Sequence, residues 1–170
     1  YTKSFRASND REVIHNDNDY FQVYGEFVKE NETHNLNLNY VKSEGKRILI
    51  NQQILEKKRE IIGKYPVISL TPDNEKITKG SPNERRNFVD KILSQTDAAY
   101  FASLLAYNRS LKQRNSLLKK KRDEKDLSYD KLMESIDELM IRDAFTIVSK
   151  RDAFIKDFNG LFQDEIKKIS

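Results

Sequence analysis

The sequence contains no cysteine, which excludes disulfide bonds, thiolate metal sites and a cysteine nucleophile. Only His15 and His34 offer an imidazole, and they lie in unrelated sequence contexts. No apolar run approaches the roughly 20 residues that span a bilayer. Residues 1–18 are polar throughout, so no signal peptide is visible. These absences favour a cytoplasmic protein without a membrane partner or a sulfur-based metal site.

Glycine is also scarce, with five in 170 residues. None of the five precedes a Lys-Ser or Lys-Thr pair at the spacing of a phosphate-binding loop. A triphosphate site needs backbone amides that cluster at the start of a helix. The sequence therefore offers no triphosphate site of its own.

The composition is polar for a globular domain, with 34% charged and 37% hydrophobic residues. Thirty-one Lys and Arg against twenty-seven Asp and Glu leave a net charge of +4, which allows a nucleic-acid partner without requiring one. The carboxylates mostly alternate with lysines on predicted helix faces. We therefore predict no self-contained hydrolase site.

The first half of the chain predicts a sheet. Residues 20–29, 36–40 and 47–50 alternate apolar and polar side chains, and short polar turns join them, which favours an antiparallel meander. A short helix is expected at residues 10–14 and another at 56–62. The latter would end at Gly63.

The apolar run at residues 67–70 follows a proline and is best interpreted as a more buried strand. The loop after it contains Thr71, Pro72 and Asp73. A polar loop at the end of a buried strand is a common place for a ligand contact. A simple Pro-Asp turn into a helix explains the same residues, so both interpretations stay open.

From Pro82 onward the pattern is helical. Pro82 suits a first helical position, with Ser81 as the capping residue. A second helix starts near Asp97, a charged break is expected at residues 119–126, and a third helix starts at Ser128. The predicted seam residues, spaced mostly by three or four, are Tyr100, Leu104, Tyr107, Leu111, Leu118, Leu132, Ile136, Leu139, Ile147, Phe154, Phe158 and Phe162. This pattern predicts two long helices paired as an antiparallel coiled coil.

Basic residues provide candidate phosphate contacts at three places. Lys3 and Arg6 lie just before the first short helix, where Arg6 could reach a phosphate, although an exposed basic segment is the simpler interpretation. Lys112 and Lys119 belong to the most basic segment, residues 107–122, which could lie along a nucleic-acid backbone. Acidic residues follow at once from Asp123, which weakens that interpretation.

The third place is the adjacent pair Arg85 and Arg86. Two neighbouring residues on a helix cannot both face the same way. We expect one arginine to pair inward with a carboxylate such as Asp90 and the other to reach outward. Structural ion pairing and a DNA phosphate contact both remain open for this pair.

These residues carry a resemblance to a known family. The run GSPNERRNFVDKILSQ at residues 80–95 and the helix at 107–121 resemble RecF, the bacterial DNA replication and repair ATPase, whose head is related to the SMC and Rad50 heads. The matching positions of the first run are Asp73, Ile77, Gly80, Ser81, Pro82, Arg85, Arg86, Phe88, Val89 and Asp90. Those of the helix are Tyr107, Asn108, Leu111, Gln113, Arg114, Asn115 and Leu118. Thr78 departs from the pattern, where a second aliphatic residue is usual. SFRASNDREVI near the start also resembles the stretch that follows the family's ATP loop.

The resemblance implies an α+β fold: a partial ABC-type ATPase lobe with a small mixed, mainly antiparallel sheet at residues 1–80, and an antiparallel coiled-coil arm at 81–170. It implies ATP and Mg²⁺ as cofactors of the full-length protein, an ATP-dependent homodimer, and binding to single-stranded/double-stranded DNA junctions at gaps. It also implies RecO and RecR as partners in RecA loading, recombination and the SOS response.

The resemblance also assigns candidate roles to individual residues. Arg6 resembles the arginine of the loop that faces nucleotide or DNA, and Thr71, Pro72 and Asp73 fall where related heads sense the nucleotide's metal. The Gly-rich ATP loop is expected before Tyr1, and the signature and acidic motifs after Ser170. We therefore predict that these 170 residues hold no complete catalytic or metal site, bind no cofactor alone and do not hydrolyse ATP.

Two other interpretations remain open. The chain could be a non-catalytic coiled-coil interaction module that binds only protein, or a head fragment of another SMC-like ABC ATPase. An upstream Gly-rich Lys-Thr loop would favour an ATPase head, and its absence would favour the module.

Overall fold

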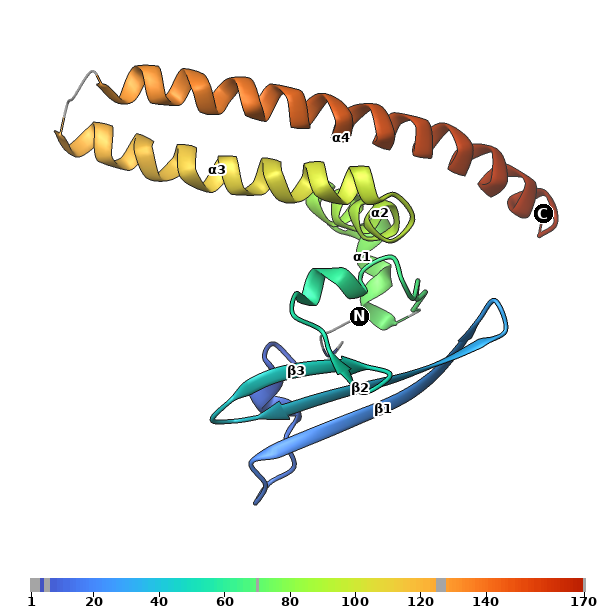
Figure 1. Ribbon diagram of the computed structural model, residues 1–170. Helices are drawn as coiled ribbons and strands as arrows, with labels where there is room; N and C mark the ends of the chain where they lie inside the picture. Colours follow the sequence, from blue (N-terminus) through green and yellow to red (C-terminus); the bar gives the residue numbers. More distant parts are fainter. Residues whose placement is uncertain (1–3, 5–6, 70, 125–127, 170) are drawn as a thin grey trace. The chain divides into compact units, whose positions relative to one another are not determined.

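The computed structural model describes residues 4, 7–69, 71–124 and 128–169 (Figure 1). Contacts within the chain define two compact units, Tyr1–Ser69 and Leu70–Ser170. The first unit is built on a sheet and the second on helices. The fold is thus α+β, as the sequence predicts.

The sheet of the first unit contains β1 (Tyr20–Lys29), β2 (Glu32–Val41), β3 (Gly45–Ile50) and β4 (Gln53–Ile54), in that spatial order. The three long strands confirm the predicted meander. Every neighbouring pair is antiparallel. The mixed character that we predicted is absent from the described residues, because the short turns between these strands can join only antiparallel neighbours.

Two tight hairpin turns set the strand register. Glu30 and Asn31 connect β1 to β2, and Asn51 and Gln52 connect β3 to β4, all with positive φ between 49° and 68°. Two successive left-handed residues are the geometry that matches the twist of a two-residue hairpin. The sequence analysis missed β4, because a two-residue strand is too short to show alternation.

One face of the sheet carries an aromatic cluster. Phe21 stacks on Tyr40 with ring centroids 5.4 Å apart, and Phe27 and His34 both contact the ring of Tyr65, at 5.1 and 5.7 Å. Ile48, at the centre of β3, is 2% exposed. His34 therefore has a packing role on the apolar face of the sheet.

Asparagines occupy the opposite face of β2. Gln22 donates to Asn37 with an Nε2–Oδ1 distance of 2.9 Å, and the Tyr24 hydroxyl donates to Asn35. These side chains alternate with the apolar ones along each strand, as in a sheet with one solvated face.

The short helices of the first unit are single 3-10 turns. The first, η1 (Asp10–Val13), confirms the predicted helix near residue 10, and the Asn9 side chain accepts hydrogen bonds from the backbone N–H groups of Arg11 and Glu12. Asp10 also accepts from Lys46 of β3, with an Oδ1–Nζ distance of 2.8 Å. The helix predicted at 56–62 is only η2 (Lys58–Ile61), and Gly63 follows it with a φ of 86°.

The strand predicted at residues 67–70 is wrong for the part that the structure describes. Residues 67–69 have no strand structure, and Ile68 is 99% exposed. Residue 70 lies outside the described residues. The sheet of the described residues consists of β1 to β4 and does not include this segment.

The second unit begins with η3 (Pro72–Glu75) and α1 (Lys76–Lys79), followed by α2 (Pro82–Thr96), α3 (Ala98–Glu124) and α4 (Ser128–Lys167). Pro82 lies at the first turn of α2 and Ser81 at its cap position, as predicted, although the Ser81 side chain makes no cap hydrogen bond. The predicted charged break is wrong for residues 119–124, which continue α3, because Lys, Arg and Glu are good helix formers.

The helices α3 and α4 pack side by side in opposite directions (Figure 1). Asp97 pairs with Lys150 and Arg114 with Asp137, so higher numbers on one helix meet lower numbers on the other. Leu93, Tyr100 and Ile147, which are 7%, 0% and 4% exposed, form a core at the junction of α2, α3 and α4. Among the described helices, none is long and apolar enough to cross a bilayer.

The predicted seam is tight only in part. Tyr100, Ile136 and Ile147 are buried, whereas Leu118, Leu132 and Leu139 are 40–48% exposed. Phe158 and Phe162, at the end of α4, are 40% and 51% exposed. Toward the first end of α4, the buried Ile136 thus lies between the half-exposed Leu132 and Leu139, and the seam positions at the last end are half-exposed.

Candidate nucleic-acid interface

Both arginines of the pair Arg85 and Arg86 are exposed in the first turns of α2. The Arg85 guanidinium donates to the backbone carbonyl of Gly80, with an Nη1–O distance of 3.1 Å. Arg86 donates to the side chain of Asn83 one turn earlier. Each guanidinium is thereby held near the start of α2 while it remains accessible to solvent.

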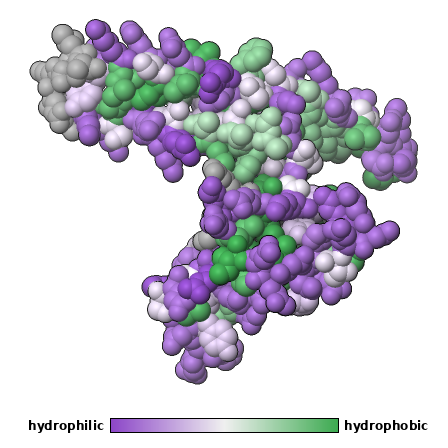
Figure 2. Space-filling view, viewed as in Figure 1, coloured by the Kyte–Doolittle hydropathy of each residue, from purple (hydrophilic) through white to green (hydrophobic). Residues whose placement is uncertain are grey.

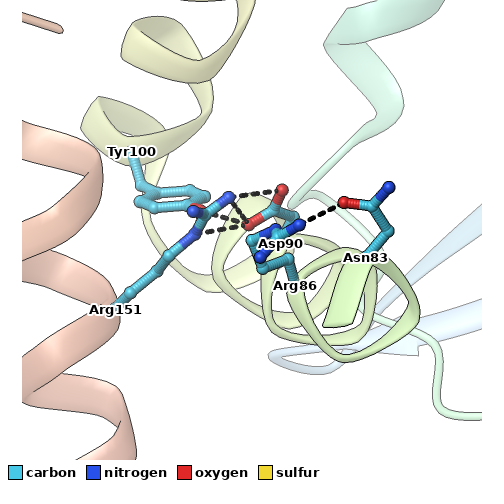
Figure 3. Close-up of polar contacts among 5 residues, drawn as sticks. All are labelled: Asn83, Arg86, Asp90, Tyr100 and Arg151. Carbon is cyan, nitrogen blue, oxygen red and sulfur yellow. Dashed lines mark hydrogen bonds and ion pairs between the residues drawn. The ribbon is translucent and has the colours of Figure 1, made fainter. Parts of the chain in front are cut away.

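The expectation that one of these arginines pairs with Asp90 is wrong. Asp90 instead forms a bidentate pair with Arg151 of α4, 61 residues away in the sequence (Figure 3). The Arg151 Nη2 atom lies 2.7 and 2.8 Å from the two carboxylate oxygens, and Nε lies 2.9 Å from Oδ1. A planar guanidinium fits a carboxylate in this two-point geometry.

The buried hydroxyl of Tyr100 completes this cluster. It donates to Asp90 Oδ1 at 2.5 Å and accepts from Arg151 Nε at 3.1 Å. Burial and the hydrogen bond to Asp90 raise the pKa of Tyr100 to about 12, so the phenol stays neutral and keeps its proton as a donor. The Asp90–Tyr100–Arg151 cluster joins one side chain from each of α2, α3 and α4.

Asp97 fixes the start of α3 against α4. Its carboxylate accepts from the backbone N–H of Tyr100 at 2.9 Å and from Lys150 Nζ at 2.7 Å. The hydrogen bond from Lys150, followed by that from Tyr100, lowers the pKa of Asp97 below its ordinary value. One carboxylate thus caps a helix and holds its neighbour.

Two of the predicted phosphate contacts, Lys112 and Lys119, are exposed on α3. They are seven residues apart, so they lie on the same side of the helix. Arg114 has a different position. Its Nε and Nη2 atoms lie 2.6 and 3.3 Å from the carboxylate of Asp137 on α4. The structure therefore separates the accessible lysines from the arginine that joins the two helices.

The loop at Thr71 forms a local turn. The backbone N–H and the hydroxyl of Thr71 both donate to Asn74 Oδ1, at 2.7 and 2.8 Å, and the Asn74 N–H donates back to the Thr71 carbonyl. Pro72 is exposed, and the backbone of Asp73 lies in η3. These contacts match the turn interpretation of the loop, and its role as a ligand contact stays a prediction.

Lys3 and Arg6 lie outside the described residues, so their predicted role has no structural counterpart here. Among the described residues, no three His, Cys, Asp or Glu side chains form a group that could hold a metal ion. The remaining candidates form two accessible basic surfaces, with Arg85 and Arg86 on α2 and Lys112 and Lys119 on α3.

Arg151 is the residue that sequence reasoning missed. It lies between Ile147 and Phe154 at the four-and-three spacing of the seam, where an apolar residue is expected. A charged residue at such a position needs a buried partner. That signal could have suggested an ion pair, but the spacing alone does not identify Asp90 as the partner.

The chain matches no profile of a protein family. It is 34% identical to the DNA replication and repair protein RecF of Salinibacter ruber over 170 residues, which cover 99% of this chain and 41% of the relative. It is 36% identical to RecF of Chloroherpeton thalassium over 160 residues, covering 92% of this chain and 42% of that protein.

A solved structure gives the same result. The chain superimposes with a TM-score of 0.82 on the recombination mediator protein RecF-ATP in the RecFOR pathway, at 31% identity, covering 91% of this chain and 41% of the other. The chain thus spans about two fifths of the length of these proteins. Along nearly its whole length, this chain is a RecF homologue that corresponds to one segment of the RecF proteins.

Proposed function

We propose that the chain is an internal segment of a RecF-type ATP-dependent DNA-binding protein that acts in recombinational repair and at replication gaps. The observation that supports this most strongly is the match to RecF over 99% of the chain at 34% identity. The likeness in fold to RecF-ATP, at a TM-score of 0.82, supports the same assignment independently of any single motif.

In this proposal residues 1–80 belong to an ATPase head and residues 81–170 to the arm, with α3 and α4 as a short antiparallel coiled coil. ATP and Mg²⁺ bind mainly to parts of the RecF protein outside the matched segment. Arg6, Thr71, Pro72 and Asp73 flank that site. The longer protein is cytoplasmic, dimerises with ATP, binds DNA junctions at gaps and acts with RecO and RecR.

The DNA surface of this segment consists of exposed cations on two helices. Arg85 and Arg86 are held at the start of α2 by the Gly80 carbonyl and the Asn83 amide, and these neutral partners leave the positive charge of each guanidinium intact. Lys112 and Lys119 add charge along one side of α3. Such groups attract phosphates without reading base sequence, and their contribution falls as salt rises.

A chimera tests the proposed function. This chain would replace the matched segment of Salinibacter ruber RecF, and the chimera would be assayed for ATP-dependent DNA binding and for rescue of DNA-damage survival in a strain that lacks RecF. The two controls are intact Salinibacter ruber RecF and the same protein without the matched segment. We expect the chimera to bind DNA with ATP and to rescue survival well above the deletion.

A folded chimera that binds neither ATP nor DNA would contradict the proposal. It would favour the alternative that the chain is a non-catalytic interaction module. We expect the isolated 170-residue chain to show no ATP turnover, because it contains no phosphate-binding loop.

A further inference from the structure

The last part of α4 carries apolar side chains that stay 40–70% exposed among the described residues. Helix α3 begins at Ala98, next to the Asp97–Lys150 and Tyr100–Arg151 contacts. Because the two helices run in opposite directions, α4 continues past the start of α3 for the residues after Phe154 (Figure 1). This distal segment of α4, residues 155–167, includes Phe158, Leu161 and Phe162.

These apolar residues extend the same seam that packs against α3. Ile147 and Phe154 belong to the junction core, and Phe158 and Phe162 follow at steps of four residues. The rings of Phe154, Phe158 and Phe162 are stacked, with 5.8 Å between successive centroids. One continuous side of α4 is therefore apolar, although α3 packs against only part of its length.

The exposure of the seam residues of α4 rises beyond the start of α3. Ile147 is 4% exposed, whereas Phe158, Phe162 and Leu161 are 40%, 51% and 70% exposed. Figure 2 shows green apolar surface on the helical unit amid purple polar residues. Charged pairs such as Lys156–Asp152 and Lys167–Asp164 border the distal segment and are largely exposed. An apolar centre with a charged rim is the usual composition of a packing interface.

We infer that the distal segment of α4 packs against an apolar surface in the part of a RecF protein that lies outside the matched segment. This inference rests on the proposed function. More than half of each relative lies outside the match, and the seam is continuous with an interface within one chain. A surface of the same RecF protein would continue the packing that α3 and α4 already make. A second copy of the chain would need a separate interface.

The test compares two Phe→Asp variants of the same helix. Phe162→Asp places a charge within the proposed interface, and the control Phe145→Asp changes a residue that is 74% exposed on another side of α4. Both are made in the isolated chain and in the chimera with Salinibacter ruber RecF. The readouts are the thermal midpoint, amide hydrogen exchange of residues 155–167, and mass by analytical ultracentrifugation.

We expect Phe162→Asp to lower the thermal midpoint of the chimera and to speed exchange of residues 155–167 roughly tenfold or more. The same variant should affect the isolated chain much less, because there it removes only the stacking contact with Phe158, and Phe145→Asp should alter neither protein. The isolated chain should sediment as a monomer.

Three results would overturn the inference: an unaffected Phe162→Asp chimera, equal effects of the two variants, or an isolated chain that dimerises until Phe162 is changed. A chimera that does not fold would also count against it. A chimera that responds as expected but shows no ATP-dependent DNA binding would refute the proposed function alone. DNA binding with an unresponsive distal segment would refute this inference alone.

Discussion

The two ends of the paired helices are held together differently. At the junction of α2, α3 and α4, Tyr100 and Ile147 are 0% and 4% exposed, and the Asp90–Tyr100–Arg151 cluster lies beside them. Toward the other end, Leu118 and Leu132 are 40% and 48% exposed, and the Arg114–Asp137 pair lies near solvent. Ile136 is 8% exposed at that end, so burial there is interrupted by half-exposed leucines, whereas it is continuous at the junction.

The largest effect is expected from a cavity at the junction. Ile147→Ala removes a side chain that is 4% exposed, and we expect the free energy of unfolding to fall by about 2–4 kcal/mol. Leu132→Ala, at the half-exposed end, should cost less than about 1 kcal/mol. Chemical denaturation of both variants measures the difference. Equal losses would show that burial is not concentrated at the junction.

The next effect comes from the ion pair of the junction. Arg151→Leu leaves the Asp90 carboxylate without its bidentate partner. Loss of one partner of a fully buried pair costs about 3–5 kcal/mol, but Arg151 and Asp90 are 24% and 18% exposed, so we expect about 2 kcal/mol. The free energy of unfolding of Arg151→Lys should lie between those of the unchanged chain and Arg151→Leu. A fully stable Arg151→Leu protein would contradict a structural role for the cluster.

A smaller effect should depend on pH. Lys150 and the Tyr100 N–H lower the pKa of Asp97 in the folded state. The charged Asp97 carboxylate therefore stabilises the folded protein above the unfolded pKa near 3.8. This stabilisation is lost as pH falls through the lower folded pKa. Asp97→Asn can still cap α3 but lacks this charge. Denaturation between pH 7 and pH 2 should show a difference of no more than about 1 kcal/mol that shrinks in acid. A pH-independent difference would assign the effect to capping alone.

The smallest effect is expected at the exposed Arg114–Asp137 pair. A double-mutant cycle with Arg114→Met and Asp137→Asn isolates their coupling. We expect a weak coupling at low salt that disappears in high salt, because exposed charges are screened. A large coupling energy that persists in high salt would show that this end of the paired helices is held as strongly as the junction.

The sequence predicts local structure better than it predicts distant partners. The strand alternation and the helix start at Pro82 both depend on neighbouring residues, and the structure confirms them. The strand at 67–70 was wrong because an apolar run does not reveal whether a neighbouring strand exists. The partner of Asp90 was missed because a contact across 61 residues depends on how the helices pack.

The candidate site shows the same limit. The sequence correctly indicates that Arg85, Arg86 and Lys112 belong to helices, whereas Lys119 falls in the predicted charged break and is helical in the structure. All four are exposed. It does not distinguish these accessible cations from Arg114, which also lies on α3 but pairs with Asp137. That distinction depends on the position of α4 beside α3.

The measurement that tests the central claim most directly is the salt dependence of DNA binding by the chimera with Salinibacter ruber RecF. The variant Lys112→Glu with Lys119→Glu is compared with Lys131→Glu and Lys156→Glu, an equal charge change on α4. If the α3 lysines contact phosphates, the first variant should flatten the plot of log affinity against log salt by roughly 1.4–1.8, since each contact contributes about 0.7–0.9. The control should keep the original slope. An unchanged slope in the first variant would contradict the assignment of this α3 surface to DNA.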